Sequence, residues 1–231
     1  MARNKRILTP GLFRHVIARG NGRMRIFLDD LDFNKFIHLL ADVVDRFEVE
    51  CWHYCLMPNH YHLTLRPSRP NLSGAVQYLN GSYGLWWNRR HDRVGHVFQG
   101  RFKDQIVQRQ DYLLTLGRYI ALNPVRAQLV ARPEEWKWSS YAGTVGLAPA
   151  PAFVAVSSVL QLFGEDVPEV LQAKFTSFVL SPNNEDQTEN RIRSTERVLG
   201  DAFFKQSLRR GMNWRGDVAE TAAADFEGAP V

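Results

Sequence analysis

Two histidines separated by one residue form the strongest chemical signal in this 231-residue chain. His60 and His62 flank Tyr61 in a segment that predicts a β-strand entered through a Pro-Asn turn. Since side chains alternate along a strand, both imidazoles project from one face, where they can bind a single divalent metal ion. Two partly exposed strand histidines, hydrogen-bonded to their neighbours, are the competing interpretation. The triplet alone does not choose between a metal site and two idle histidines.

A third metal ligand is offered by a predicted helix that begins near Asp111. Tyr119 and Asn123 lie four residues apart in this helix, so their side chains share a face. The amide oxygen of Asn123 can complete a three-ligand site with His60 and His62. Asn123 precedes a proline, which favours extended backbone and leaves the helical spacing open at that position. Tyr119 also suits the edge of a hydrophobic core.

Positive charge is concentrated in the first part of the chain. Residues 1–145 contain 21 Lys and Arg against 12 Asp and Glu, a balance of +9, whereas residues 146–231 contain 8 against 12, a balance of −4. Lys and Arg that neutralise phosphates release condensed counterions, so a basic region with interleaved aromatic residues suits nucleic acid. A generic basic surface explains the charge equally well. Nucleic acid is therefore a candidate partner.

The predicted elements place the two histidines in an antiparallel sheet. Strands are expected at 13–19, 49–56 and 60–66, helices at 31–47 and 72–90, a short strand pair at 94–107, and a last helix from 111 that stops at Pro124. The order strand–helix–strand–strand–helix–strand is that of a split βαβ, or ferredoxin-like, unit. We therefore expect an α+β fold in which helices cover one face of an antiparallel sheet.

A change in composition after Tyr141 divides the chain. Residues 143–151 are rich in Gly, Ala and Pro and predict a linker, and helical patterns follow at 152–180 and 191–210. We expect a first domain at 1–145, a mostly helical extension at 146–216, and a small, acidic, disordered tail at 217–231.

Other features bear on the compartment. The sequence contains no run of about 18 apolar residues, so we predict no membrane span. No apolar signal segment follows the basic start. Cys51 and Cys55 lack a second cysteine pair and predict buried thiols rather than a zinc site. We expect a cytoplasmic protein that associates with the nucleoid.

Several segments together resemble one family. The run from Met57 to His62 resembles the His-hydrophobic-His motif of the single-tyrosine HUH transposases, and Arg118 to Ala127 resembles their catalytic helix in the REP-associated tyrosine transposases. Residues 96–103 and 138–141 are similar to the same branch. The resemblance covers residues 10–145, in order and in register.

The resemblance implies a transposase-like enzyme. His60, His62 and Asn123 would hold Mg²⁺ or Mn²⁺, and Tyr119 would be the nucleophile, with Tyr112 as the alternative. The enzyme would cleave and rejoin single-stranded DNA beside a hairpin through a 5′-phosphotyrosine intermediate, as a monomer or a homodimer. Bases could stack on Trp86, Trp87 or Phe98, although at least one tryptophan is expected in the core. The candidate DNA contacts are Arg14, Arg19, Arg23, Trp87, Arg89, Arg90, Arg101, Lys103 and Arg126.

Two other functions stay open at this point. A ferredoxin-like module can bind nucleic acid without catalysis, and a metal-dependent nuclease can use water in place of a tyrosine. A protein–DNA adduct distinguishes the tyrosine enzyme from both.

Overall fold

The computed structural model describes residues 9–109, 111–181, 187–194 and 196–209. The expected disordered tail at 217–231 lies outside the described residues and stays a prediction. Within the described ranges, no helix is both long enough and apolar enough to cross a membrane.

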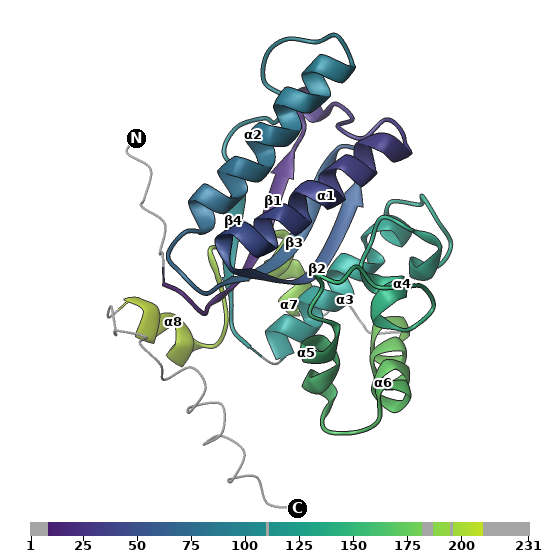
Figure 1. The fold of residues 1–231 in the computed structure, drawn as a ribbon. Coiled ribbons are helices and arrows are strands. Elements are labelled where there is room, and N and C mark those ends of the chain that lie inside the picture. Colours follow the sequence, from purple (N-terminus) through teal and green to yellow (C-terminus); the bar gives the residue numbers. More distant parts are fainter. Residues whose placement is uncertain (1–8, 110, 182–186, 195, 210–231) are drawn as a thin grey trace, which may run out of the picture.

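The strands form one sheet in the order β2-β3-β1-β4-β5 (Figure 1). They are β1 (Phe13–Arg19), β2 (Val49–Met57), β3 (His60–Pro67), β4 (Lys103–Val107) and β5 (Val198–Leu199). The first four pair antiparallel, which confirms the predicted α+β, ferredoxin-like class. β5 pairs parallel to β4, so the complete sheet is mixed. A two-residue strand has no alternation pattern, which is why β5 has no sequence signal.

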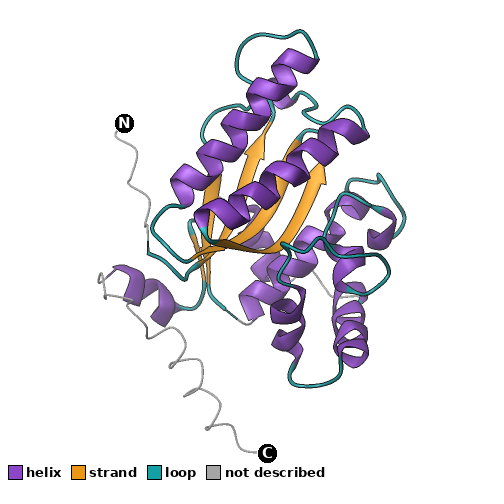
Figure 2. Ribbon diagram, in the orientation of Figure 1, coloured by secondary structure: helices purple, strands orange, loops and turns teal. Residues whose placement is uncertain are grey.

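Two helices, α1 (Asp30–Phe47) and α2 (Leu72–Arg90), cover one face of the sheet as predicted (Figure 2). The Asp29 carboxylate starts α1 by accepting backbone N–H bonds from the first turn. Tyr61, Leu63 and Leu65 of β3 are fully buried in the core beneath these helices. The two-residue alternation of the strand then turns His60 and His62 to the opposite face.

A further helix, α3 (Asp111–Arg126), lies on that opposite face. Leu113, Leu116 and Ile120 of α3 are buried in a second core, together with Phe13 and Trp52 from the sheet. Because the sheet carries apolar side chains on both faces, both faces need a covering layer. The structure therefore has the two expected helices on one face of the sheet and, in addition, α3 on the other face.

The predicted strand pair at 94–107 is only partly formed. β4 accounts for its second half, whereas the first half contributes a single bridge between Phe98 and Gly20. Gly95 and Gly100 have positive φ values of 95° and 152°, which interrupt an extended chain.

Part of the chain after residue 140 packs against α3, and its last described helix packs instead beside Leu12 and Ile106 at the β4 edge of the sheet. Its elements are α4 (Tyr141–Thr144), α5 (Val156–Leu160), α6 (Pro168–Leu180), α7 (Gln187–Arg193) and α8 (Ala202–Arg209). The helical pattern predicted at 152–180 is divided into α5 and α6, with Gly164 at a φ of 103° between them. α3 contacts both α6 and α7, and β5 extends the sheet. The domain boundary at residue 146 stays a prediction.

Gly117 allows α3 to approach the sheet closely. A Cβ atom at Gly117 would lie 2.8 Å from the Nε2 atom of His53, a buried β2 residue. We expect Gly117→Ala to lower the free energy of unfolding by about 1–3 kcal/mol, because overpacking outweighs the gain of about 1 kcal/mol in helix propensity. Chemical denaturation measures the change.

Gly81 provides the matched control. It also lies inside a helix, but a Cβ atom there would meet nothing within 4 Å. Gly81→Ala is expected to stabilise the protein by up to about 1 kcal/mol. Equal effects of the two alanine substitutions would contradict the close approach of α3.

Candidate active site

The two histidines of β3 lie side by side on the face of the sheet that α3 covers. The His60 and His62 rings lie 5.0 Å apart between centroids, at an angle of 79°. His62 is buried and His60 is half-buried, with its Nδ1 atom 2.6 Å from the amide oxygen of Asn59. The shared face predicted from strand alternation is present. We call this side of the sheet, which α3 covers, the histidine face.

Tyr119 approaches the histidine pair from α3. Its ring centroid is 5.7 Å from that of His62, in an edge-to-face arrangement, and the side chain is half-buried. Burial raises the pKa of the Tyr119 phenol, while Arg193, a hydrogen bond from Asn123 and the charge of Arg126 act in the opposite direction. The structure therefore places the Tyr119 phenol beside the His60–His62 pair, although Tyr119 follows that pair by about 60 residues in the sequence.

Asn123 lies one helical turn after Tyr119. Its Nδ2 atom donates a hydrogen bond of 2.9 Å to the backbone oxygen of Tyr119, so the amide oxygen is the atom available to a cation. α3 continues through Pro124 to Arg126 rather than stopping at the proline. The helical spacing between Tyr119 and Asn123 is thus preserved, and the expected break at Asn123 does not occur.

Tyr112, the alternative nucleophile, is engaged elsewhere. Arg191 donates a hydrogen bond of 3.0 Å to its hydroxyl and places its guanidinium carbon 5.1 Å from the ring centroid. The ring contacts found for the described residues connect Tyr119, not Tyr112, with the histidines.

A third histidine belongs to this cluster, and sequence analysis does not single it out. His15 of β1 is fully buried, and its Nε2 atom lies 2.9 Å from Nδ1 of His62. Its other ring nitrogen, Nδ1, lies 2.9 Å from Oε1 of Gln105 on β4. A lone histidine in a strand has no motif to mark it, and only the pairing of β1 with β3 and β4 brings these groups together.

The donor set suits a divalent metal only if an amide takes part. Within the described ranges, no group of three His, Cys, Asp or Glu side chains is arranged to hold a metal ion. His60 and His62 are kept neutral by burial, which lowers the pKa of His60 to about 4 and shifts that of His62 in the same direction. Neutral imidazoles can donate a lone pair. With Asn123 as an oxygen ligand, two imidazoles and one amide would form a mixed nitrogen and oxygen donor set, which suits Mn²⁺ better than Mg²⁺.

The comparison with known proteins identifies the family. Residues 10–123 match the family model described as "Transposase IS200 like". Residues 10–123 therefore form an IS200-like transposase domain. The matched residues include His60, His62 and Tyr119 and end at Asn123. The family predicted from the sequence motifs is thus confirmed.

Two solved structures resemble this transposase. One is described as a REP-associated tyrosine transposase bound to a REP hairpin; it is 18% identical, with a TM-score of 0.55 over 64% of this chain and 89% of that one, and shows that the fold is shared. The other is a Deinococcus radiodurans R1 protein described provisionally as a transposase, 17% identical over 56% of this chain and 92% of that one. Its TM-score of 0.36 supports no structural argument. No curated protein sequence matches the chain.

Two of the expected DNA contacts are not accessible. Trp87 is only 2% exposed and is part of the core, so no base can stack on it in this conformation. Arg14 is equally buried, with its guanidinium 3.2 Å from the Asp104 carboxylate. Contrary to the prediction, neither side chain is placed to contact DNA. The strand and helix patterns did not reveal that these two positions face the interior.

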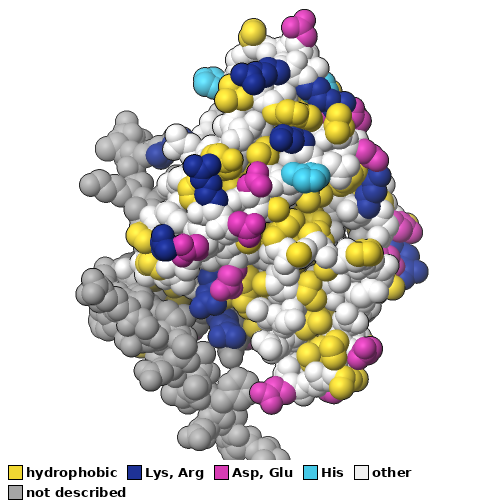
Figure 3. Space-filling view, in the orientation of Figure 1, with side chains coloured by type: hydrophobic (Ala, Val, Ile, Leu, Met, Phe, Trp, Pro, Cys, Tyr) yellow, Lys and Arg dark blue, Asp and Glu magenta, His cyan; other side chains and the backbone are white. Residues whose placement is uncertain are grey.

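Phe98, another candidate for base stacking, is also buried in the core, at 8% exposed. The remaining candidates reach the surface. Arg90 is half-buried and forms ion pairs with Asp29 and Asp32. Figure 3 shows that over α1 and α2 the positive side chains are scattered among Asp and Glu. Near the histidine face, Arg19 pairs in register with His60, and Lys103 pairs with Ile17. The exposed candidates are Arg19, Arg23, Arg89, Arg101, Lys103 and Arg126.

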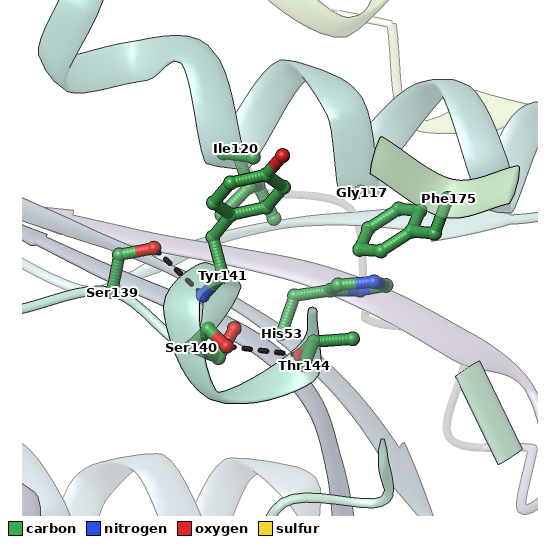
Figure 4. Close-up of a pocket in the computed structure, with 9 residues that line it drawn as sticks. His53, Gly117, Ile120, Ser139, Ser140, Tyr141, Thr144 and Phe175 are labelled. Carbon is green, nitrogen blue, oxygen red and sulfur yellow. Dashed lines mark hydrogen bonds between the residues drawn. The ribbon is translucent and has the colours of Figure 1, made fainter. Parts of the chain in front are cut away.

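A small cavity lies beneath α3 and is lined by His53 rather than by His60, His62 or Tyr119 (Figure 4). Its volume is about 10 Å³, close to the minimum for one water molecule. His53 lines it with Phe175, at 6.4 Å between ring centroids, and the buried Nδ1 atom of His53 has no hydrogen-bond partner in the structure. This cavity has no room for a nucleotide and belongs to the packing of the fold.

His53 makes the stability of the protein depend on pH. Burial lowers its pKa from 6.5 to about 4, so below pH 6.5 the unfolded chain takes up a proton that the folded chain does not. Stability is therefore highest above pH 6.5 and falls as the pH approaches 4. Between pH 7 and 5 we expect His53 to account for a loss of about 2 kcal/mol.

The His53→Leu variant isolates this contribution. Its free energy of unfolding should fall less steeply between pH 7 and 5 than that of the wild type, as measured by denaturant titration at each pH. The other buried histidines are present in both proteins and cancel in the comparison. Identical pH dependence would show that His53 is not held neutral by burial.

Proposed function

We propose that this transposase cleaves and rejoins hairpin-bearing single-stranded DNA by transesterification through Tyr119, assisted by a divalent metal. The observation that carries the proposal is that Tyr119 lies beside the His60–His62 pair on one face of the sheet. The ring centroids of Tyr119 and His62 are 5.7 Å apart. A phenol beside neutral imidazoles combines a nucleophile with metal ligands in one place.

The chemistry balances without an external energy source. The Tyr119 oxygen attacks the phosphorus atom, a phosphotyrosine ester forms, and the bond to the 3′ oxygen breaks to leave a free 3′-hydroxyl. Because one ester replaces another, attack by a second 3′-hydroxyl reverses the step and joins strands. A bound Mg²⁺ or Mn²⁺, held by His60, His62 and the Asn123 amide oxygen, would polarise the scissile phosphate.

Positive charge near Tyr119 assists loss of its proton, against the effect of burial. The guanidinium carbons of Arg126 and Arg193 lie 5.3 Å and 6.0 Å from its ring centroid. Positive charge at this range stabilises a developing phenolate, which opposes the increase in pKa that burial causes.

The substrate class is proposed from shape and charge. The structure that shares this fold at a TM-score of 0.55 is described as bound to a REP hairpin. Here, exposed arginine and lysine side chains, among them Arg19 and Lys103, surround the histidine face. A single strand is more flexible than a duplex, so a phosphate beside a hairpin can be turned in line with the Tyr119 oxygen.

One substitution tests the nucleophile. Tyr119→Phe should abolish the SDS-resistant adduct with a labelled hairpin-bearing single strand in Mn²⁺, because the attacking oxygen is gone. DNA affinity should stay within about fivefold, since one hydrogen-bonding hydroxyl contributes about 1 kcal/mol. Gel electrophoresis and fluorescence anisotropy measure the two quantities.

Tyr112→Phe is the matched control and should retain the adduct. An adduct that survives in Tyr119→Phe but not in Tyr112→Phe would assign the nucleophile to Tyr112. Cleavage without an adduct in the wild type would indicate a water-using nuclease. Binding without cleavage would indicate a nucleic-acid-binding module, and either result contradicts the proposal.

A further inference from the structure

A line of hydrogen-bonding groups leads from Glu196, just before β5, to His62. Nε2 of Gln105 donates a hydrogen bond of 2.8 Å to the backbone oxygen of Glu196. Oε1 of Gln105 lies 2.9 Å from Nδ1 of His15, and Nε2 of His15 lies 2.9 Å from Nδ1 of His62. His15 is fully buried, and Gln105 and His62 are 6% and 4% exposed, so water does not replace these partners.

The direction of each bond follows from its fixed end. The carbonyl oxygen of Glu196 can only accept, so the Gln105 amide must point its NH₂ group towards Glu196 and its oxygen towards His15. An oxygen acceptor then requires the proton of His15 to be on Nδ1. In neutral His15 the second nitrogen, Nε2, carries a lone pair and accepts. The proton between the two rings therefore belongs to Nδ1 of His62.

The opposite arrangement is unfavourable. If Nε2 of His15 donated to His62, both nitrogens of His15 would carry protons and the ring would be a cation. That charge would lie on a side chain with no exposed surface, next to an amide oxygen and a second imidazole rather than a carboxylate. A buried charge without an ionic partner is costly.

We propose that His15 and Gln105 are positioning residues that hold His62 as the Nδ1–H tautomer, with Nε2 as the nitrogen that binds the metal. This inference rests on the proposed function for the role of His62 as a ligand. It assigns roles to two residues that do not touch the DNA or the ion themselves.

The anchor of the line is supplied by the C-terminal part of the chain. Backbone pairing fixes its position, since Ile106 of β4 donates a hydrogen bond of 2.8 Å to the oxygen of Arg197. The Glu196 side chain is held by Arg191, with Nε 2.8 Å from Oε2, and by Lys205. The short strand β5 thus serves to place one carbonyl oxygen, and residues beyond 146 take part in ordering the histidine face.

The tautomer can be observed directly in the protein without metal or DNA. In a ¹⁵N-histidine-labelled sample, long-range ¹H–¹⁵N NMR distinguishes the protonated from the unprotonated nitrogen of each neutral ring. We expect His62 to show a protonated Nδ1 and an unprotonated Nε2. A wild-type His62 protonated at Nε2 would overturn the inference, whatever the behaviour of any variant.

A pair of variants then tests the origin of the tautomer. Gln105→Met has similar volume but no acceptor, so His62 should populate both tautomers and the Mn²⁺ affinity measured by calorimetry should fall by about 10–100-fold. Gln108→Met is the matched control: it removes a glutamine that bonds Asp201 and lies outside this line, so it should keep the wild-type tautomer and affinity. Equal behaviour of the two variants would contradict the role of Gln105.

The outcome is separable from that of the proposed function. Loss of the adduct in wild-type protein would reject the tyrosine chemistry, while the NMR spectrum still reports the tautomer. A Gln105→Met variant that keeps the wild-type unfolding midpoint and circular dichroism but changes the His62 spectrum supports positioning. If it unfolds, the wild-type spectrum alone decides.

Discussion

The burial of one face of β3 is the constraint on which the site depends. Tyr61, Leu63 and Leu65 are fully buried beneath α1 and α2, and the strand period of two then directs His60 and His62 to the other side. A shift of one residue in the pairing of β3 with β1 would expose the three apolar side chains and place the histidines in the core. The free energy that fixes the direction of the two histidines is therefore hydrophobic, and it is supplied by the apolar side chains on the other face of the strand.

The second requirement is that α3 lie close to the sheet. The contact between Gly117 and His53 leaves no space for a Cβ atom, and Tyr119 follows two residues later on the same helix. Close packing also removes water from the histidine face, which keeps the imidazoles neutral and raises the pKa of the phenol. The same burial that keeps the imidazoles neutral thus opposes ionisation of Tyr119. Nearby positive charge has to offset that effect.

Local patterns predicted the local parts of this arrangement. The alternation around His60 and the four-residue spacing from Tyr119 to Asn123 depend on periods of two and of about four, which are visible in a sequence. The contacts of His15 with His62 and Gln105 join residues 47 and 90 positions apart, and only strand pairing creates them. Trp87 was misplaced for a related reason: basic neighbours suggested a surface position, whereas the fold turns its ring into the core.

Ion pairs hold the charged side chains near Tyr119 in place in the protein without DNA. Glu189 of α7 is buried and pairs with Arg126 and Arg193, and its other oxygen lies 3.9 Å from Arg118. Two of these guanidiniums, those of Arg126 and Arg193, also lie over the Tyr119 ring. Their side chains are already ordered by the Glu189 carboxylate, so a phosphate that enters in the proposed reaction immobilises few additional rotamers. The acidic C-terminal part of the chain, which the overall charge balance sets apart from the basic front, is in this way a structural component of the basic site.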